Sequence, residues 1–196
     1  MTSYNTFIMK LFARGKRGII YKQGNIIIKV KNPESKAVAR IENEAEYLKL
    51  LNKKKIGPKF ISFKNNKLKY RFIKGDYIID FLKKNNKKKI IEVLKNVSNQ
   101  CFIMDKLKIN KLEMHHPVKH ILIDKKPVLI DFERCYKTNN SKNVTQFIQF
   151  IISNNLKKIL LKKKIIINRK KMIKLAKEYK KNMNKENFNK LLKEIK

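Results

Sequence analysis

Two short segments carry most of the residues in this chain whose types and spacing suit chemistry. Residues 112–123 read LEMHHPVKHILI, a loop rich in ionisable side chains that leads into an apolar run. Residues 128–133 read VLIDFE, an apolar run that ends on carboxylates. A turn at 124–127 would join the two runs as a β-hairpin and bring their polar ends together. The side chains expected to converge there, where they could hold a metal ion and a phosphate group, are Glu113, Lys119, His120 and Asp131.

Asp131 is the first candidate for a metal ligand. It follows the apolar run 127–130 and precedes Phe132 and Glu133. Mg²⁺ prefers oxygen ligands and usually takes one or two carboxylates together with substrate phosphates, which suits an acid at the end of a strand. The alternative is that Asp131 only closes a strand at the surface.

Lys29 lies in a run of β-branched residues, IIIKV at 26–30. Alternation along a strand puts Lys29 on the same face as Ile27. That face would carry a charge among apolar groups unless an anion is supplied, because a buried charge needs a partner. The alternative is that Lys29 lies on a surface edge and pairs with nothing.

The first part of the chain is predicted to form a small sheet with one helix. The runs 18–22 and 25–30, separated by Gln23-Gly24, predict one hairpin, and the runs 60–63 and 67–73 predict another. Between them the pattern becomes helical from Ser35 until Gly57-Pro58 ends the helix. The apolar residues on one face of this helix are Ala37, Ile41, Ala45, Leu48 and Leu51.

The second part of the chain is predicted to be mainly helical apart from the hairpin. Residues 74–76, with the sequence KGD, are the best candidate for a hinge. Apolar residues recur at helical spacing in 77–83 and 88–106, and another helix is expected to begin near Asn143. Two further helices are expected to have the N-caps Asn168 and Asn184. The chain is therefore predicted to be α+β, with regions at 1–73 and 74–196.

The composition leaves two interpretations of the charge open. The formal net charge is +35, and clustered cations suit nucleic-acid binding. However, only six of the 50 basic residues are Arg, and the excess of Lys accompanies an excess of Asn and Ile, all with A/T-rich codons. We expect codon bias that places Lys on solvated faces to account for most of the charge, and nucleic-acid binding is the alternative.

Cysteine usage and hydropathy point away from secretion. The 42% apolar content is enough for a core, and Cys101 and Cys135 are expected to be buried and unpaired. No secretory leader and no run of about 18 apolar residues is found. We expect a cytoplasmic protein without a membrane partner.

The order of these features resembles a small atypical protein kinase, of the RIO type and the related archaeal predicted serine/threonine kinases. The likeness covers about 15–150. It implies a protein-kinase-like bilobal fold, with an N-lobe at 1–73 and a reduced helical C-lobe at 74–196. Gly15, Lys16 and Gly18 match the Gly-rich loop over the ATP phosphates, although the full GxGxxG is absent and a plain turn is the alternative.

The resemblance also assigns roles to the charged residues of both regions. Lys29 would pair with the α- and β-phosphates, and its partner would be Glu44, with Glu46 as the alternate. In the loop 113–120, Glu113 would accept or orient the proton of the attacking hydroxyl. Lys119 would neutralise charge on the transferred γ-phosphoryl group. Asp131 would bind metal, as in a DFG motif with Glu133 in place of Gly.

His120 stands where that resemblance places a metal-binding Asn. We expect it to bind metal with Asp131, but imidazole suits Zn²⁺ or Mn²⁺ better than Mg²⁺. Hydrogen bonding to Glu113 or to a metal-bound water is the alternative. His115, His116 and His120 could also form a transition-metal site, although Pro117 argues against the helix that this spacing requires.

The resemblance therefore implies an ATP-dependent phosphotransferase. Its cofactors would be ATP and Mg²⁺, with Mn²⁺ as a substitute, and the γ-phosphoryl group would pass to a Ser or Thr hydroxyl. The acceptor would be a protein, a small molecule or the enzyme itself. The alternative function is a catalytically weak nucleotide-binding scaffold whose Lys-rich surface binds RNA or a ribosomal particle.

Overall fold

The computed structural model describes residues 8–36 and 39–196, which form an α+β fold. Contacts divide the chain into two compact units. The first contains the residues up to Ile73 together with Asp131–Arg134, and the second contains Lys74–Ile130 and Cys135–Lys196. We expected 131–134 in the helical region, and this was wrong. The segment belongs to the first unit because side chains of that unit supply its hydrogen-bond partners.

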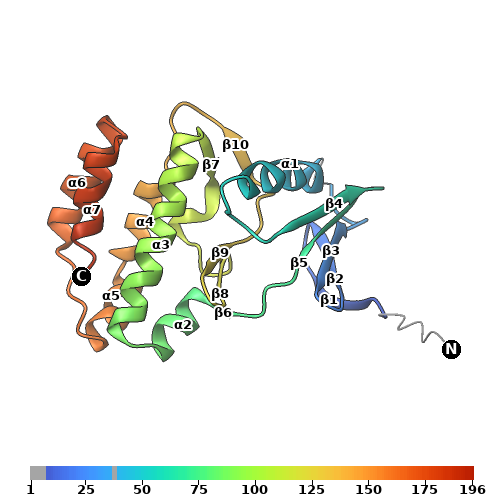
Figure 1. Ribbon diagram of the computed structural model, residues 1–196, viewed down its shortest axis with the longest axis horizontal. Helices are drawn as coiled ribbons and strands as arrows, with labels where there is room; N and C mark the ends of the chain where they lie inside the picture. The colour runs from blue at the N-terminus through green and yellow to red at the C-terminus, as the bar shows by residue number, and fades with distance from the viewer. Residues whose placement is uncertain (1–7, 37–38) are drawn as a thin grey trace. The chain divides into compact units, whose positions relative to one another are not determined.

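The first unit is built on an antiparallel sheet that has five strands in the described part of the chain, in the order β1-β2-β3-β5-β4 (Figure 1). The two hairpins predicted from the sequence are present, but the first turns at residues 24–25 rather than at 23–24. The edge strand β1 was not predicted, because its sequence, KLFAR, does not alternate between apolar and polar residues. All five of its residues are exposed, so neither face of the strand needs to be apolar. The strands are β1 (Lys10–Arg14), β2 (Gly18–Gln23), β3 (Ile26–Lys31), β4 (Phe60–Lys64) and β5 (Lys67–Arg71).

Helix α1 (Arg40–Asn52) packs on this unit through one face, on which Ile41, Leu48 and Leu51 are buried. It begins later than the predicted start at Ser35, and Ala37, expected on its apolar face, lies outside the described residues. Gly57 follows with φ +85°, a conformation that disfavours side chains. A Cβ there would lie 2.7 Å from Leu48 Cδ1 and 2.9 Å from Phe132 Cε2, so the close approach of 131–134 requires glycine.

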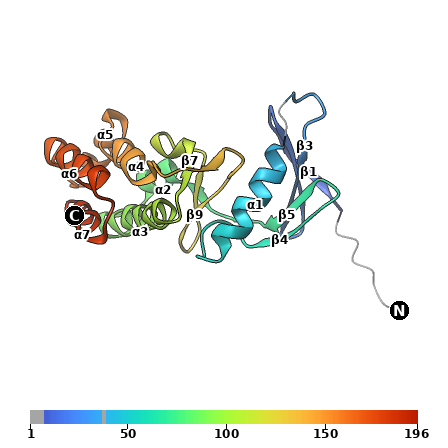
Figure 2. The same cartoon turned by 90° about the horizontal axis from the view of Figure 1, so that it is seen from above.

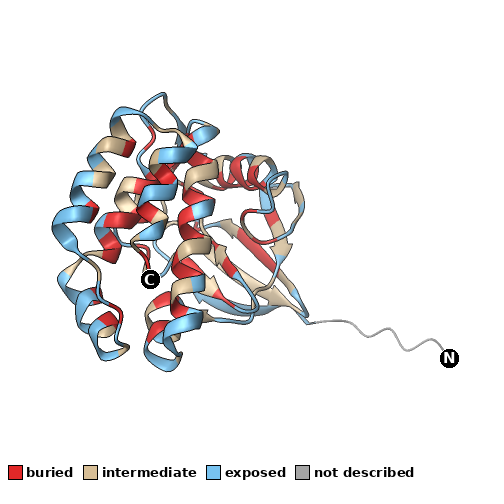
Figure 3. Ribbon diagram, turned by 60° about the vertical axis from the view of Figure 1, so that its left-hand side comes forward, coloured by how far each residue is buried: buried red, intermediate tan, exposed pale blue. Residues whose placement is uncertain are grey.

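The second unit contains six of the α-helices of the described chain, and α3, α4, α6 and α7 pack against one another (Figure 2). Figure 3 shows their buried residues on the sides that face other helices. Cys101 and Cys135 are buried and free, as predicted. The helices are α2 (Ile78–Lys84), α3 (Lys87–Lys106), α4 (Asn143–Ile151), α5 (Asn154–Lys162), α6 (Arg169–Lys181) and α7 (Lys185–Lys193).

Two small sheets accompany these helices. One pairs β6 (Asp76–Tyr77), β8 (Ile121–Ile123) and β9 (Pro127–Leu129), and the other pairs β7 (Ile109–Lys111) with β10 (Cys135–Lys137). The β8–β9 hairpin was predicted, whereas β6, β7 and β10 were not. Strands of two or three residues are too short to show an alternating pattern, and β6, β7 and β10 lack the pair of apolar runs around a turn that marks the equally short β8 and β9.

The predicted N-caps of the last two helices are confirmed. Asn168 Oδ1 accepts a hydrogen bond from Lys171 N at 3.0 Å, and Asn184 Oδ1 accepts one from Asn187 N at 2.8 Å. Each cap satisfies a backbone donor that the first turn of a helix leaves without a partner. Within the described residues, no helix has both the length and the apolar composition needed to cross a membrane.

The buried carboxylate of Asp105 joins α3 to α4 and α6. Its Oδ1 accepts from the backbone N and side-chain Nδ2 of Asn143 at 3.0 and 2.8 Å. Its Oδ2 accepts from Val144 N at 3.2 Å and from the Tyr179 hydroxyl at 3.0 Å. Asn143 Oδ1 in turn accepts from Lys111 N at 2.8 Å, so this network fixes the end of β7.

Replacing Tyr179 with Phe should lower the free energy of unfolding by about 1.5–3 kcal/mol, because a hydrogen bond to a charged group is lost in the core. Burial and the charge of Asp105 raise the pKa of Tyr179 well above its usual value, so the hydroxyl remains a donor. Urea denaturation measures the change. Tyr77→Phe, at a side chain that is 42% exposed, serves as the control and should have no effect. Equal stability of Tyr179→Phe and wild type would contradict this role.

Candidate active site

Lys29 lies in β3, between β2 and β5, and is only 6% exposed. Its Nζ donates to Glu44 Oε2 at 2.6 Å and to Asp131 Oδ1 at 3.0 Å, and lies 3.7 Å from Glu133 Oε2. The alternative of an unpartnered surface lysine is therefore wrong. Glu46 is exposed, and the partner of Lys29 on α1 is Glu44.

Residues 15–18 form a tight turn between β1 and β2, closed by a hydrogen bond from Gly15 N to Gly18 O of 2.9 Å. Lys16 is exposed at this turn. A Cβ at Gly18 would lie 3.1 Å from Lys29 Cε, so glycine leaves room for the lysine stem. Arg17 Nη1 donates to Glu133 Oε1 at 2.9 Å, which ties the turn to residues 131–134.

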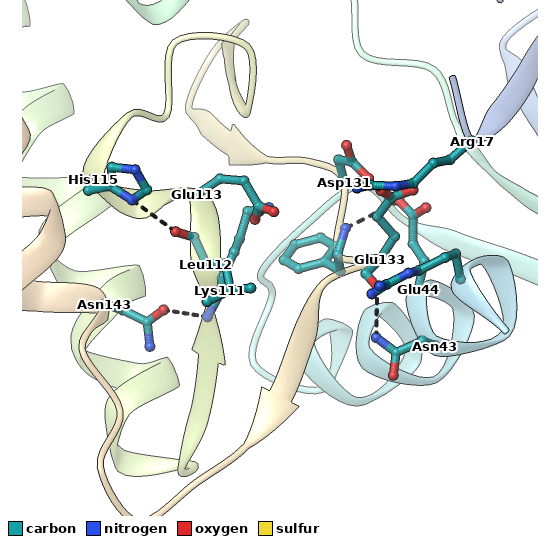
Figure 4. A network of polar contacts seen from close by, with 12 residues as sticks. Arg17, Asn43, Glu44, Lys111, Leu112, Glu113, His115, Asp131, Glu133 and Asn143 are labelled. Atoms are coloured by element: carbon teal, nitrogen blue, oxygen red, sulfur yellow. Dashed lines mark hydrogen bonds and ion pairs between the residues drawn. The ribbon is translucent and has the colours of Figure 1, made fainter. Parts of the chain in front are cut away.

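Residues 131–134 are held by α1. Asp131 has φ +63°, an unfavourable value for a residue with a side chain, although Asp tolerates it better than most. Phe132 N donates to Glu44 Oε1 at 3.3 Å, and Asn43 Nδ2 donates to Glu133 O at 3.0 Å (Figure 4). Strained backbone that is fixed by its surroundings is concentrated at functional sites.

Three carboxylates gather in this unit. Glu44, Asp131 and Glu133 each offer an oxygen, and these oxygens lie within 4.8 Å of one another. Their side chains are 2%, 35% and 10% exposed, so Asp131 is the most accessible. Oxygen donors of this type fit Mg²⁺ or Mn²⁺.

His120, which we expected to bind metal with Asp131, belongs to the second unit and is not part of this group. The additional acid beside Asp131 is Glu133, a residue that was not assigned to the site from the sequence. Its position two residues after Asp131 was visible in the sequence, but its orientation depends on Arg17 and Lys29, which are distant along the chain.

The charges around Lys29 fix its protonation. Burial alone would lower the pKa of Lys29, but the charges of Glu44 and Asp131 outweigh burial and raise it well above its usual value. Burial raises the pKa of Glu44, and the Lys29 ammonium opposes that shift. Lys29 is therefore an ammonium at neutral pH.

This raised pKa predicts how stability depends on pH. In the unfolded chain Lys29 loses its proton at its ordinary pKa of about 10.4. In the folded chain it keeps that proton to a higher pH. The contribution of Lys29 is therefore fully present below about pH 10.4 and is lost as the pH rises towards the folded pKa. Denaturation of wild type and Lys29→Met at increasing pH should show a stability difference that shrinks above that point. A constant difference would contradict the pKa shift.

In the second unit, Glu113 pairs with a buried lysine. Lys111, at the end of β7, has a side chain that is 0% exposed, and its Nζ donates to Glu113 Oε2 at 3.1 Å. Glu113 is 13% exposed, and Figure 4 shows Lys111 between it and Asn143. Lys111 was not identified from the sequence. Lysine is abundant in this chain, and no sequence pattern distinguishes this buried lysine from the exposed ones.

The remaining residues of the loop are placed as follows. Leu112–His115 forms a 3₁₀ helix, Lys119 is exposed, and the backbone N of His120 donates to Pro117 O at 2.9 Å. His120 O accepts from Ile130 N at 3.0 Å, which continues the β8–β9 pairing. No group of three ligating side chains in the described chain includes a histidine, so the alternative histidine metal site has no support.

No protein-family model and no curated protein matches the chain. The resemblance to atypical kinases therefore rests on the residues and intervals described above.

Proposed function

We propose that this protein is a protein-kinase-like phosphotransferase that transfers the γ-phosphoryl group of Mg-ATP to a hydroxyl. The observation that carries the proposal is the buried ammonium of Lys29 between Glu44 and Asp131. Taking these charges out of water costs several kcal/mol per ion, so such a group is weak evidence of a stabilising role. The buried group of Lys29, Glu44 and Asp131 is better explained as a preorganised site for phosphate and metal.

In the first unit, Lys29 and the three acids grouped around it would take part in this reaction. Lys29 would contact the α- and β-phosphates, while Glu44 orients it. Asp131, the most accessible acid of the group, would hold Mg²⁺, and Glu133 supplies a further oxygen donor. When bound, the metal neutralises phosphate charge. The turn at 15–18 would place its backbone near the phosphates.

By the kinase resemblance, Glu113 of the second unit would orient the attacking hydroxyl. Because phosphoryl transfer has a loose transition state, orientation matters more than base strength, and a carboxylate suffices. Lys111 holds Glu113 in place through the 3.1 Å contact. Lys119, exposed in the same loop, would neutralise charge on the transferred group.

Calorimetric titration with ATP tests the proposal. Wild type should bind ATP more tightly with Mg²⁺ than with EDTA, and Asp131→Asn should lose this difference. A highly basic protein binds any polyanion, so inorganic tripolyphosphate is the control for charge alone. Equal affinity for ATP and tripolyphosphate, unaffected by metal removal and by Asp131→Asn, would contradict the proposal.

A second candidate function is RNA binding, favoured by one surface of the second unit. A cavity of about 380 Å³ between α2 and α5 is lined by Ile159 and four lysines, with no acid. These lysines are Lys83, Lys158, Lys162 and Lys163. RNA affinity measured against salt should show a slope that falls by about 1 for each lysine replaced by Gln. An unchanged slope would exclude this surface.

A further inference from the structure

Helices α4 and α6 of the second unit enclose an apolar groove of about 350 Å³. The wall from α4 and the residue after it includes Ile148 and Ile152, and the wall from α6 includes Ile173 and Ala176. Ile173 is 38% exposed, although it is apolar. This groove lies outside the residues assigned to phosphoryl transfer.

Each wall is a single helical face. The lining positions 145, 148, 149 and 152, and likewise 173, 176, 177 and 180, are spaced i, i+3, i+4, i+7. The groove therefore follows about two turns of each helix rather than forming a round pocket. An elongated apolar ligand fits this shape, and grooves between helices accept a third helix in many complexes.

The charged residues of the groove are all basic. Its lining includes Lys142, Lys177 and Lys180 and no Asp or Glu. Lys180 Nζ donates to Ser141 O at 2.6 Å, which holds it at the rim. Burial lowers the pKa of Lys180, the charge of the buried Asp105 opposes that shift, and the charge of Lys142 adds to it. The lysines of the lining give this rim a positive charge that suits an acidic ligand.

We propose that this groove binds an acidic amphipathic helix of a partner protein. Apolar side chains of that helix would cover Ile148 and Ile173, and its acidic side chains would face the lysines of the rim. This division into an apolar centre and a charged rim is the usual arrangement of protein interfaces. The charges would accelerate association and select an acidic partner, and the apolar contacts would supply affinity.

The test uses a fluorescent peptide of about 14 residues, or four helical turns, with Leu at i, i+3, i+4, i+7 and Glu at most other positions. Anisotropy with the full-length protein at about 150 mM salt measures its affinity. A scrambled peptide of the same composition is the control for charge alone. The amphipathic peptide should bind, and the scrambled one should bind at least about tenfold more weakly.

Three variants test whether the peptide binds in this groove. Ile173→Gln should weaken binding of the amphipathic peptide by about tenfold, because an apolar anchor is lost. Leu161→Gln, at a residue of α5 that is 47% exposed, should have no effect. Lys177→Gln should slow association and reduce its dependence on salt. Circular dichroism checks that each variant is folded.

Three results would overturn the proposal. The first is equal binding of the two peptides, which would show attraction by net charge alone. The second is equal binding by wild type and Ile173→Gln. The third is self-association of the protein that is lost in Ile173→Gln and is unaffected by peptide, which would identify a second copy of the chain as the occupant. None of these results bears on phosphoryl transfer.

Discussion

Asp131→Asn should slow phosphoryl transfer from Mg-ATP by about 10²- to 10³-fold, the usual loss when one preorganised electrostatic group is removed from a site. The substitution keeps the size of the side chain and removes its charge. An amide binds Mg²⁺ more weakly than a carboxylate does, so ATP binding should also lose its dependence on metal. Transfer is measured with γ-labelled ATP under saturating nucleotide.

The same substitution should leave stability within about 1 kcal/mol of wild type. Asn tolerates the left-handed conformation of Asp131, φ +63°, so the backbone need not change. The side chain of Asp131 is 35% exposed, so its contact with Lys29 is partly screened by solvent. Lys29 also keeps its 2.6 Å contact with Glu44.

Asp124→Asn, at an exposed acid in the turn between β8 and β9, is the matched control. It should retain full transfer. If Asp131→Asn and Asp124→Asn transferred phosphate at the same rate, Asp131 would have no role in the reaction. If Asp131→Asn unfolded, its loss of activity would have a structural cause.

Lys29→Met should abolish transfer and also lower the free energy of unfolding by about 3–5 kcal/mol. Removing the ammonium leaves Glu44, 2% exposed, as a buried carboxylate without its cation. The substitution is costly for the fold because both members of the pair are buried. Lys31→Met, at an exposed lysine on the same strand, is the control.

A double variant separates the two effects. Lys29→Met with Glu44→Gln removes both members of the closest ion pair, while Glu133 keeps its contact with Arg17 and Gln still accepts a hydrogen bond from Phe132 N. Its stability should recover to near that of wild type, because replacing both members of a buried pair costs far less than replacing one. Its activity should remain absent. Recovery of activity together with stability would show that Lys29 acts only on the fold.

The helices and the main hairpins could be predicted because their signals are local. The apolar face of α1, the caps at Asn168 and Asn184, and the β8–β9 hairpin are each determined by residues close in the sequence. The partner of Lys29 could also be chosen, because the kinase resemblance places an acid on the helix after the strand, and Glu44 stands there.

Other features of the site depend on contacts between distant residues. Glu133 joins the acidic group through Arg17, which is 116 residues away in the chain, and no spacing rule predicts such a pair. Lys111 is recognisable as unusual only once it is seen to be fully buried. The membership of 131–134 in the first unit likewise follows from long-range hydrogen bonds to α1.

Phosphorus NMR of ATP incubated with the wild-type protein and Mg²⁺ tests the central claim most directly, because it follows the fate of the γ-phosphoryl group. We expect the γ resonance to decline as ADP forms together with a phosphate ester or inorganic phosphate. EDTA or Asp131→Asn should prevent the change. A γ resonance that persists unchanged with Mg²⁺ and with Mn²⁺, in the presence of folded protein and hydroxyl acceptors, would contradict the assignment of Lys29 and Asp131 to phosphoryl transfer.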